Sequence, residues 1–487
     1  MKKEKINEAI GQLDENIVAE ADAVRRETRR KREGIGKIVS VAASAAIILL
    51  GVMVVKNMPA EIEAETEAAP VAQAVYPEVV QYPTDQFSEG FDERYTAWRE
   101  SRYANVPEEG YADGLDGYFR KTVSEFLVDT EGGNRVFSPL SLYMALSMAA
   151  ETAGGESREQ ILDLIGHDSI ESLRKQANAV WRANYSNDGA TTSIMANSLW
   201  FDAGINYNAD TVNTIAENYY ASVYHGTMGS ESIDNAIHEW LNMQTGGLLE
   251  DSVEQLKTTP EMIMALFSTV YYRAKWDIEF SPENNEMMMF HSPSGDTEEE
   301  FMYLFTRGDY YWSENFGAIS LRLENSGSMW LVLPDEGVTP EELMADEKLF
   351  LLTCSGKQYL SEKEWPDQKN VRIHLRMPKF DASSDFKLTE GLKKLGVTDI
   401  FDGSAADLTP LVGEDSGMKP SYTSAKQAAR VVVDEEGVTA AAYTAMVMAG
   451  AARPPEEEVE FTLDRPFFFA LSHNAALPLF TGIVNEP

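Results

Sequence analysis

The sequence predicts a mixed α+β fold, because segments with helical periodicity come first in the folded part of the chain and strand-like segments dominate later. Residues 116–127 and 136–150 carry apolar side chains at helical spacing. Eight short apolar segments are typical of strands: 193–201, 263–272, 319–323, 329–333, 371–377, 430–433, 459–463 and 467–471. This order argues against a regular alternation of strands and helices.

The composition indicates a large core under an acidic surface. Of 487 residues, 44% are hydrophobic, which is enough for a large packed domain and leaves room for further segments. The 41 Lys and Arg residues against 79 Asp and Glu give a net charge of −38. Such a surface repels phosphate backbones, so we expect no nucleic-acid partner.

The residues that usually carry catalysis or bind metals form no recognisable motif. Cys354 is the single cysteine, which excludes an intrachain disulfide, and its apolar neighbours predict a buried side chain. The six histidines form no HExxH pattern, so we expect no metal and no cofactor. Ser384 and Lys387 match the S-x-x-K motif of penicillin-recognising enzymes, but neither S-D-N nor K-T-G accompanies it. An enzyme is therefore not predicted.

The N-terminal part resembles a membrane anchor. A segment with many Arg and Lys residues (1–37) precedes residues 38–55, IVSVAASAAIILLGVMVV, which carry no charge. Eighteen helical residues span roughly 27 Å, just enough to cross a bilayer. The basic flank predicts a cytoplasmic N-terminus, so the remainder would be extracellular in a single-pass cell-membrane protein. A cleaved signal peptide, with processing near 58–60, and a buried core helix are the alternatives.

Residues 56–111 are rich in Glu, Ala, Pro and Tyr and show no apolar period. We expect an extended acidic extracellular linker there. It would hold the globular domain, residues 112–487, away from the membrane surface.

Residues 431–455 carry the most information about function. A β-branched strand leads into Asp434, Glu435, Glu436 and Gly437, followed by small and mostly apolar residues and a Pro-Pro pair. Helix propensity alone would make 440–448 an Ala-rich helix.

These residues resemble the serpin family, serine protease inhibitors, here of the bacterial type with an added anchor. The DEEG and AAA sequences (434–437 and 440–442) are similar to the hinge of the family's reactive loop. Further motifs follow in the family's order: 134–142 (NRVFSPLSL), 197–201 (NSLWF), 271–276 (YYRAKW), 378–380 (PKF), 395–401 (LGVTDIF), 406–408 (ADL), 464–469 (DRPFFF) and 480–487 (FTGIVNEP). The resemblance covers about residues 112–487.

The resemblance implies a serpin fold, with helices first, then a large central sheet, smaller sheets and an exposed reactive-centre loop. A target protease cuts this loop, which inserts into the sheet as a new strand and traps the acyl-enzyme. In the family's register Val438, Ala440, Ala442 and Thr444 of the hinge point inward. Thr439, Ala441 and Tyr443 point outward. Val438 replaces the family's usual Thr or Ser, and Tyr443 replaces a small residue.

Counting sixteen residues beyond Glu435 places the scissile bond at Ala451–Ala452, and Pro454-Pro455 gives the same bond. A small residue before the bond suits elastase-like proteases. Arg453 precedes a proline, so a cut after it is disfavoured. Val447 and Met448 stay open as alternatives.

Residues that control opening of the sheet are also implied by the resemblance. Ser138 and Ser141 match the serines at the sheet's centre, called the shutter, and Trp276 matches the tryptophan at its top, called the breach. Gln427 stands where the family has a shutter histidine, and Ser268 stands where it has an asparagine. Glutamine both donates and accepts hydrogen bonds, so a neutral shutter can persist.

Two further classes of function remain open. A serpin fold kept only as a surface binding or adhesion module predicts loop cleavage without a stable complex. A cell-wall enzyme using Ser384 predicts labelling by β-lactams. We expect a monomer that can form loop-sheet polymers on heating. The sequence does not name the physiological protease.

Overall fold

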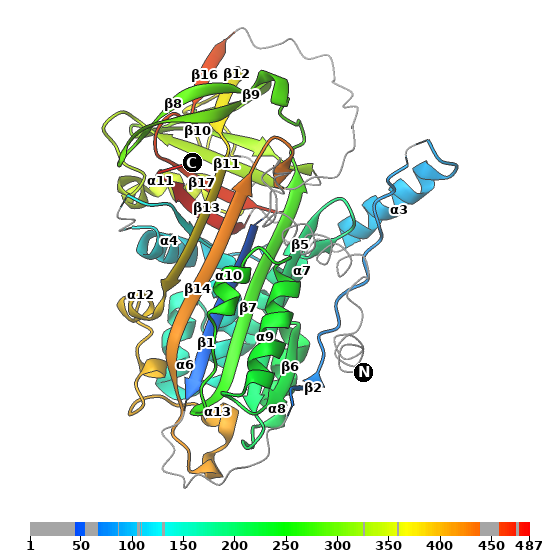
Figure 1. Cartoon of the computed structure of the whole chain (residues 1–487), viewed down its shortest axis with the longest axis vertical. Helices are drawn as coiled ribbons and strands as arrows, with labels where there is room; N and C mark the ends of the chain where they lie inside the picture. Colours follow the sequence, from blue (N-terminus) through cyan, green and yellow to red (C-terminus); the bar gives the residue numbers. More distant parts are fainter. Residues whose placement is uncertain are drawn as a thin grey trace, which may run out of the picture.

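Two mixed sheets and the helices around them form the α+β architecture that the sequence predicts (Figure 1). The computed structural model describes residues 44–53 and 67–487, except 86, 105–107, 109, 129–131, 325–326, 358–359, 439–456 and 474–476.

The first sheet, called the main sheet here, runs along the long axis of the molecule (Figure 1). Its strands, in spatial order, are β13 (Phe380–Lys387), β14 (Ser421–Val433), β1 (Ser44–Met53), β7 (Met262–Lys275), β5 (Thr192–Asp202), β6 (Ala221–Gly226) and β2 (Ala69–Ala72). Two short strands join it: β4 (Ser186–Asn187) pairs with β5, and β15 (Gly437–Val438) pairs with β7.

The second sheet lies toward the upper end of the view in Figure 1. Its order is β16 (Glu458–Thr462), β12 (Gln368–Pro378), β9 (Gly295–Trp312), β10 (Phe316–Arg322), β11 (Ser328–Pro334), β17 (Phe467–Ser472), β18 (Pro478–Val484) and β3 (Arg135–Phe137), and β8 (Glu286–Ser292) pairs with β9. All eight segments predicted as strands overlap strands of these two sheets, and only Leu323 and Leu463 lie one residue beyond the strand ends.

The helices are concentrated in the first half of the described chain. They are α3 (Phe91–Ala104), α4 (Leu115–Phe126), α5 (Pro139–Thr152), α6 (Gly155–Ile165), α7 (Ile170–Asn184), α8 (Ala209–Asn218), α9 (Glu231–Gln244), α10 (Glu250–Glu254), α11 (Glu347–Thr353), α12 (Thr389–Lys394) and α13 (Thr409–Val412). Short 3₁₀ turns lie at η1 (Pro282–Asn284), η3 (Glu342–Ala345), η4 (Asp399–Phe401) and η5 (Glu414–Ser416).

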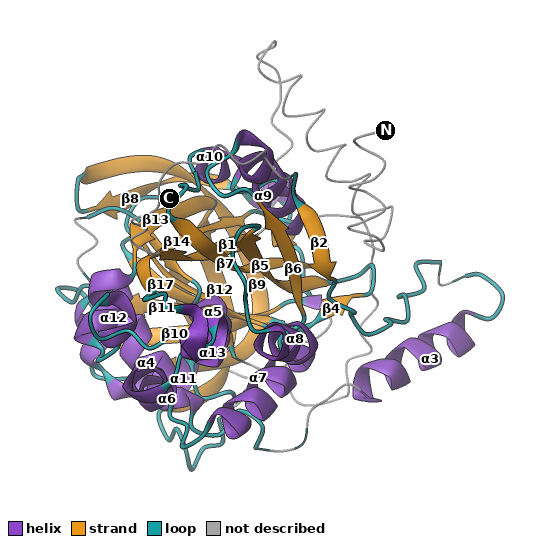
Figure 2. Cartoon of the chain, turned by 90° about the horizontal axis from the view of Figure 1, so that it is seen from below, coloured by secondary structure: helices purple, strands orange, loops and turns teal. Residues whose placement is uncertain are grey.

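Both faces of the main sheet are covered, as the end-on view in Figure 2 shows. One face packs on the larger core cluster, which includes the fully buried helix α5 and the second sheet. The other face packs under α9, where Trp240 and Ile237 contribute to a second cluster. Alternate residues of the central strands therefore enter different cores, as a period of two requires.

The structure differs from the sequence prediction in the apolar segment. A membrane-spanning helix was predicted over 38–55, whereas Ser44–Met53 form strand β1 at the centre of the main sheet. Residues 1–43 and 54–55 lie outside the described residues. No helix in the described part of the chain is both long and apolar enough to cross a membrane.

The predicted extended linker is also partly ordered against the domain. Strand β2 pairs with β6, and the Trp98 indole N–H of α3 donates to Asp188 Oδ2 (2.9 Å). Tyr76 packs against Trp181, with ring centroids 5.2 Å apart. Parts of residues 67–104 thus contact the domain through strand pairing, a hydrogen bond and aromatic packing, where an extended linker was predicted.

Candidate functional site

The chain reverses direction at the upper end of the main sheet, where β14 ends. A tight turn over residues 434–436 follows β14. Gly437 then pairs with Lys275, and Val438 pairs with Ala274, antiparallel to β7. The residues predicted as the hinge thus begin a new strand beside β7.

Gly437 is required by the closeness of this pairing. Its φ is +136°, a conformation that favours glycine. A Cβ at this position would lie 2.6 Å from Lys275 Cα and 2.7 Å from the Ala274 carbonyl oxygen. A larger residue would therefore separate β15 from β7.

Trp276 holds the turn over residues 434–436 in place through hydrogen bonds. Its indole N–H donates to the Asp434 carbonyl (2.9 Å), and its backbone N–H donates to the Glu436 carbonyl (3.2 Å). The Phe280 N–H donates to the Glu435 carbonyl (3.1 Å). Trp276 is only 2% exposed, so it is a packed support for this turn.

A polar cluster holds the Glu435 side chain at the same end of the sheet. Lys379 Nζ lies 2.7 Å from Glu435 Oε1 and 2.8 Å from Glu300 Oε2. Asn285 Nδ2 donates to both carboxylates. Burial by itself would raise the pKa of Glu435, but the hydrogen bonds from Lys379 and Asn285 outweigh it and hold that pKa below its ordinary value. The hinge is therefore tied to the second sheet by a charged, partly buried network.

The predicted shutter residues come together beneath the centre of the main sheet. The Ser138 N–H donates to Gln427 Oε1 (3.0 Å), and Gln427 Nε2 donates back to the Ser138 carbonyl (3.1 Å). The Ser141 hydroxyl donates to the Ser268 carbonyl (3.1 Å). Ser138, Ser141, Ser268 and Gln427 are all fully buried. The Gln427 side-chain amide thus accepts one hydrogen bond from the Ser138 backbone and donates another to it, without any charge.

Strand β1 lies between the two strands that carry these residues, in the position called the slot here (Figure 1). Ile48 is opposite Ser268 of β7 on one side and opposite Gln427 of β14 on the other. Strands β7 and β14 are both antiparallel to β1, so they run parallel to each other across it.

The remaining predicted loop residues lie outside the described part of the chain. These are Ala440, Ala441, Ala442 and Thr444 of the hinge, Ala451 and Ala452 of the predicted reactive bond, and Tyr443, Val447, Met448 and Arg453. The described chain resumes at Glu457 and enters β16, which pairs parallel with β12. The loop therefore connects the hinge to the second sheet.

Ser384 and Cys354, which the sequence also singles out, both lie in packed parts of the fold. The Ser384 hydroxyl accepts a hydrogen bond from the Val136 N–H (2.8 Å). Ser384 and Lys387 are three residues apart in strand β13, so their side chains leave opposite faces and cannot form a catalytic pair. Cys354 is buried, and burial raises the pKa of its thiol to about 12, as expected for a core residue.

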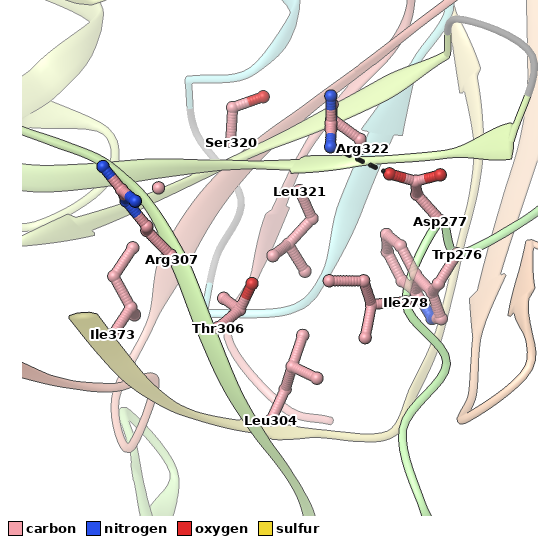
Figure 3. Close-up of a pocket in the computed structure, with 11 residues that line it drawn as sticks. Trp276, Asp277, Ile278, Leu304, Thr306, Arg307, Ser320, Leu321, Arg322 and Ile373 are labelled. Atoms are coloured by element: carbon pink, nitrogen blue, oxygen red, sulfur yellow. Dashed lines mark ion pairs between the residues drawn. The ribbon is translucent and has the colours of Figure 1, made fainter. Parts of the chain in front are cut away.

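A pocket beside the breach is lined by Trp276, Leu304, Ile373 and the side chains around them (Figure 3). Its two guanidinium groups already have partners. Arg322 lies 3.0 Å from Asp277, and Arg307 donates to Asn370 (2.8 Å). We therefore assign it no ligand.

Sequence reasoning missed three residues of the site: Lys379, Glu300 and Asn285. The PKF motif (378–380) contained Lys379, but its partners come from distant parts of the sequence. The occupant of the slot was missed as well, because its uncharged residues were interpreted as a membrane helix.

The fold and the site define a protein in which a short strand, β15, begins beside β7 at the upper end of a large sheet. The family description "Serpin (serine protease inhibitor)" matches residues 120–487. This chain belongs to the serpin family.

Relatives and a solved structure agree with this assignment. Human neuroserpin is 26% identical over 400 residues, covering 79% of this chain and 92% of the relative. Mouse leukocyte elastase inhibitor A is 27% identical over 369 residues, covering 73% and 93%. The native crystal structure of the thermophilic serpin tengpin superposes with a TM-score of 0.62 at 24% identity, covering 78% of this chain and 95% of that chain.

Proposed function

We propose that this chain inhibits serine proteases by offering residues 439–456 as bait and inserting the cleaved loop between β7 and β14. The observation that carries the proposal is the pairing of β15 with β7. Gly437 and Val438 already run antiparallel to β7 at the mouth of the slot, in the direction that an inserted strand would take. Cleavage would free the rest of the loop to continue this ladder.

Elastase-like proteases are the proposed targets, cutting at Ala451–Ala452. Two features of the sequence support this preference. The residue before the bond is small, and the bond after Arg453 is followed by proline and resists cleavage. A relative of this chain bears the name leukocyte elastase inhibitor A.

One observation favours the alternative, a binding or adhesion module that does not inhibit. The slot is occupied by β1, and an occupied slot opposes loop insertion. The test must therefore include a chain in which β1 has been displaced, and Leu50→Asp serves this purpose because Leu50 is a fully buried residue of β1.

The experiment mixes pancreatic elastase with the full chain and with Leu50→Asp, followed by denaturing gels and mass spectrometry. We expect a covalent complex that survives SDS and a released peptide beginning at Ala452. Cleavage of both chains without any complex, repeated across a panel of serine proteases, would overturn the inhibitory function and favour the binding module.

We further propose that residues 38–55 can anchor the chain in the cell membrane with the serpin domain outside, in an arrangement that excludes β1, because Ser44–Met53 cannot span a membrane and lie in the main sheet at once. The uncharged run and its basic flank support this location. Retention of the chain in membranes after a carbonate wash is expected, and full release would contradict it.

A further inference from the structure

Strand β1 makes two complete ladders in the main sheet. It pairs antiparallel with β14 from Ser44, opposite Val431, to Met53, opposite Ser421. On its other side it pairs with β7 over the same ten residues. The backbone of the slot is thus satisfied by a segment from the far N-terminal end of the chain.

We propose that the slot is a strand-binding site whose ligand is this chain's own segment Ser44–Met53, and that this segment competes with the reactive loop. The competition rests on the proposed inhibitory function, whereas the occupancy of the slot does not.

The registers of the two competitors coincide. Val438 is opposite Ala274, so a loop that continued this ladder would bring Ala440 opposite Tyr272. Ser44 already occupies that place. Both strands run antiparallel to β7, so loop residues 440–448 would fall where Ser44–Val52 now lie. An inserted loop and β1 would therefore need the same hydrogen-bonding groups.

The side chains match in direction as well. Ala46, Ile48 and Leu50 are fully buried in the larger core cluster, and Ile47 enters the cluster under α9. In the shared register Ala442 would replace Ala46 and Thr444 would replace Ile48. These are the loop residues predicted to point inward, so the two segments present the same faces to the same cores.

The chain can place its own segment in the slot. Val52 is opposite Met264, which is opposite Phe201 in β5. Phe201 is opposite His225, and His225 is opposite Ala69 of β2, so β1 and β2 reach the same level of the sheet. Strands β7, β5 and β6 lie between β1 and β2, so four strand spacings of about 4.8 Å place β1 and β2 roughly 19 Å apart. Residues 54–66 can span up to about 45 Å, so insertion within one molecule needs no stretched chain.

Displacing β1 without changing the serpin domain tests the proposal. Leu50 is fully buried, opposite Leu266 on one side and Ala425 on the other, so Leu50→Asp would bury a charge between two apolar neighbours. Val75→Asp is the matched control, because Val75 also lies in the N-terminal part but is 83% exposed. Hydrogen exchange of residues 44–53 and the fraction of elastase trapped are measured on full chains.

We expect slow exchange of residues 44–53 in the unmodified chain and in Val75→Asp. In Leu50→Asp this protection is lost, and the trapped fraction rises by at least about tenfold. Fast exchange of residues 44–53 in the unmodified chain would overturn the occupancy, and equal trapping by all three chains would overturn the competition. Protection that disappears on dilution would assign the strand to a second copy and contradict insertion within one molecule. Loss of protection in Leu50→Asp with no trapping by any chain would leave the occupancy standing and refute the inhibitory function.

Discussion

At the scale of single residues, the centre of the main sheet holds a hydroxyl group without a partner. Ser268 Oγ is buried and makes no hydrogen bond to any described residue, and apolar Ile48 lies opposite it. A buried hydroxyl left unpaired costs about 1–3 kcal/mol. The shared register would bring Thr444 of an inserted loop to this place, so loop insertion offers Ser268 a partner that β1 does not.

The sequence allowed some of these residues to be predicted and not others. Ser138 and Gln427 were identified from motifs, and the chemistry of glutamine predicted the neutral pair that the structure shows. The contact between Lys379 and Glu435 joins residues 56 positions apart and carries no periodic signal. Such pairs depend on how the two sheets are packed, so propensity and spacing do not reveal them.

Lys379→Met should destabilise the native fold, because it leaves Glu435 buried without its cation. The expected loss in free energy of unfolding is about 1–3 kcal/mol, less than for a fully buried pair because Lys379 is a third exposed. Urea unfolding measures the loss. Lys369→Met is the matched control, since Lys369 pairs with Glu457 on the surface, and an equal effect of both variants would contradict the role of the cluster.

His473 should make stability depend on pH. Its ring is buried, both nitrogens lack a partner among the described residues, and burial lowers its pKa to about 3. The unfolded chain, with an ordinary pKa of about 6.5, binds the proton more readily. The contribution of His473 is therefore complete above about pH 6.5 and is lost as the pH falls toward 3.

Replacing His473 with Leu should flatten the fall in unfolding free energy between pH 6.5 and 4. His291→Leu is the control, because His291 is exposed and its pKa is raised by Asp296, an effect of opposite sign. An unchanged pH profile in His473→Leu would show that other groups cause the acid sensitivity.

At the scale of elements, helices and strands with a clear period were predicted, and the differences occurred where the period was ambiguous. Helix α5 begins at Pro139, later than predicted, because Ser138 caps it and residues 135–137 pair in β3. Residues 44–53 are uncharged throughout, and an apolar run fits a membrane helix or a strand buried on both faces. The choice between a membrane helix and a buried strand depends on pairing with β7 and β14, which the local sequence does not reveal.

The register of the hinge makes a prediction at this scale. Val438→Arg should turn the inhibitor into a substrate, because residue 438 pairs with Ala274 at the start of the ladder that an inserted loop must continue, and an unpaired charge there opposes that ladder. In the Leu50→Asp background, elastase should cleave this variant with at least about a tenfold loss of trapped complex.

Thr439→Arg is the matched control for that variant, since the alternation of side chains directs residue 439 outward. It should retain complex formation. Trapping by Val438→Arg at the unmodified level would contradict the assigned register.

At the scale of the whole molecule, the loop joins the upper ends of two sheets, and the slot runs down the main sheet toward α13 and η5 (Figure 1). An inserted loop of about sixteen residues, at about 3.3 Å each, would carry a bound protease roughly 50 Å toward that lower end. This path is implied by the sequence's resemblance to serpins and stays a prediction. The sequence did not predict that another segment of the chain would already lie along this path.

Energy transfer between the lower end of the serpin and the protease tests trapping by translocation most directly. Asp415, in η5, is exposed, and Asp415→Cys offers a unique label site because the only native cysteine, Cys354, is buried. A donor on this residue in the Leu50→Asp chain and an acceptor on elastase should show strong transfer in the SDS-resistant complex. A covalent complex with weak transfer, in which the protease stays at the upper end, would contradict insertion of the loop as the mechanism of inhibition.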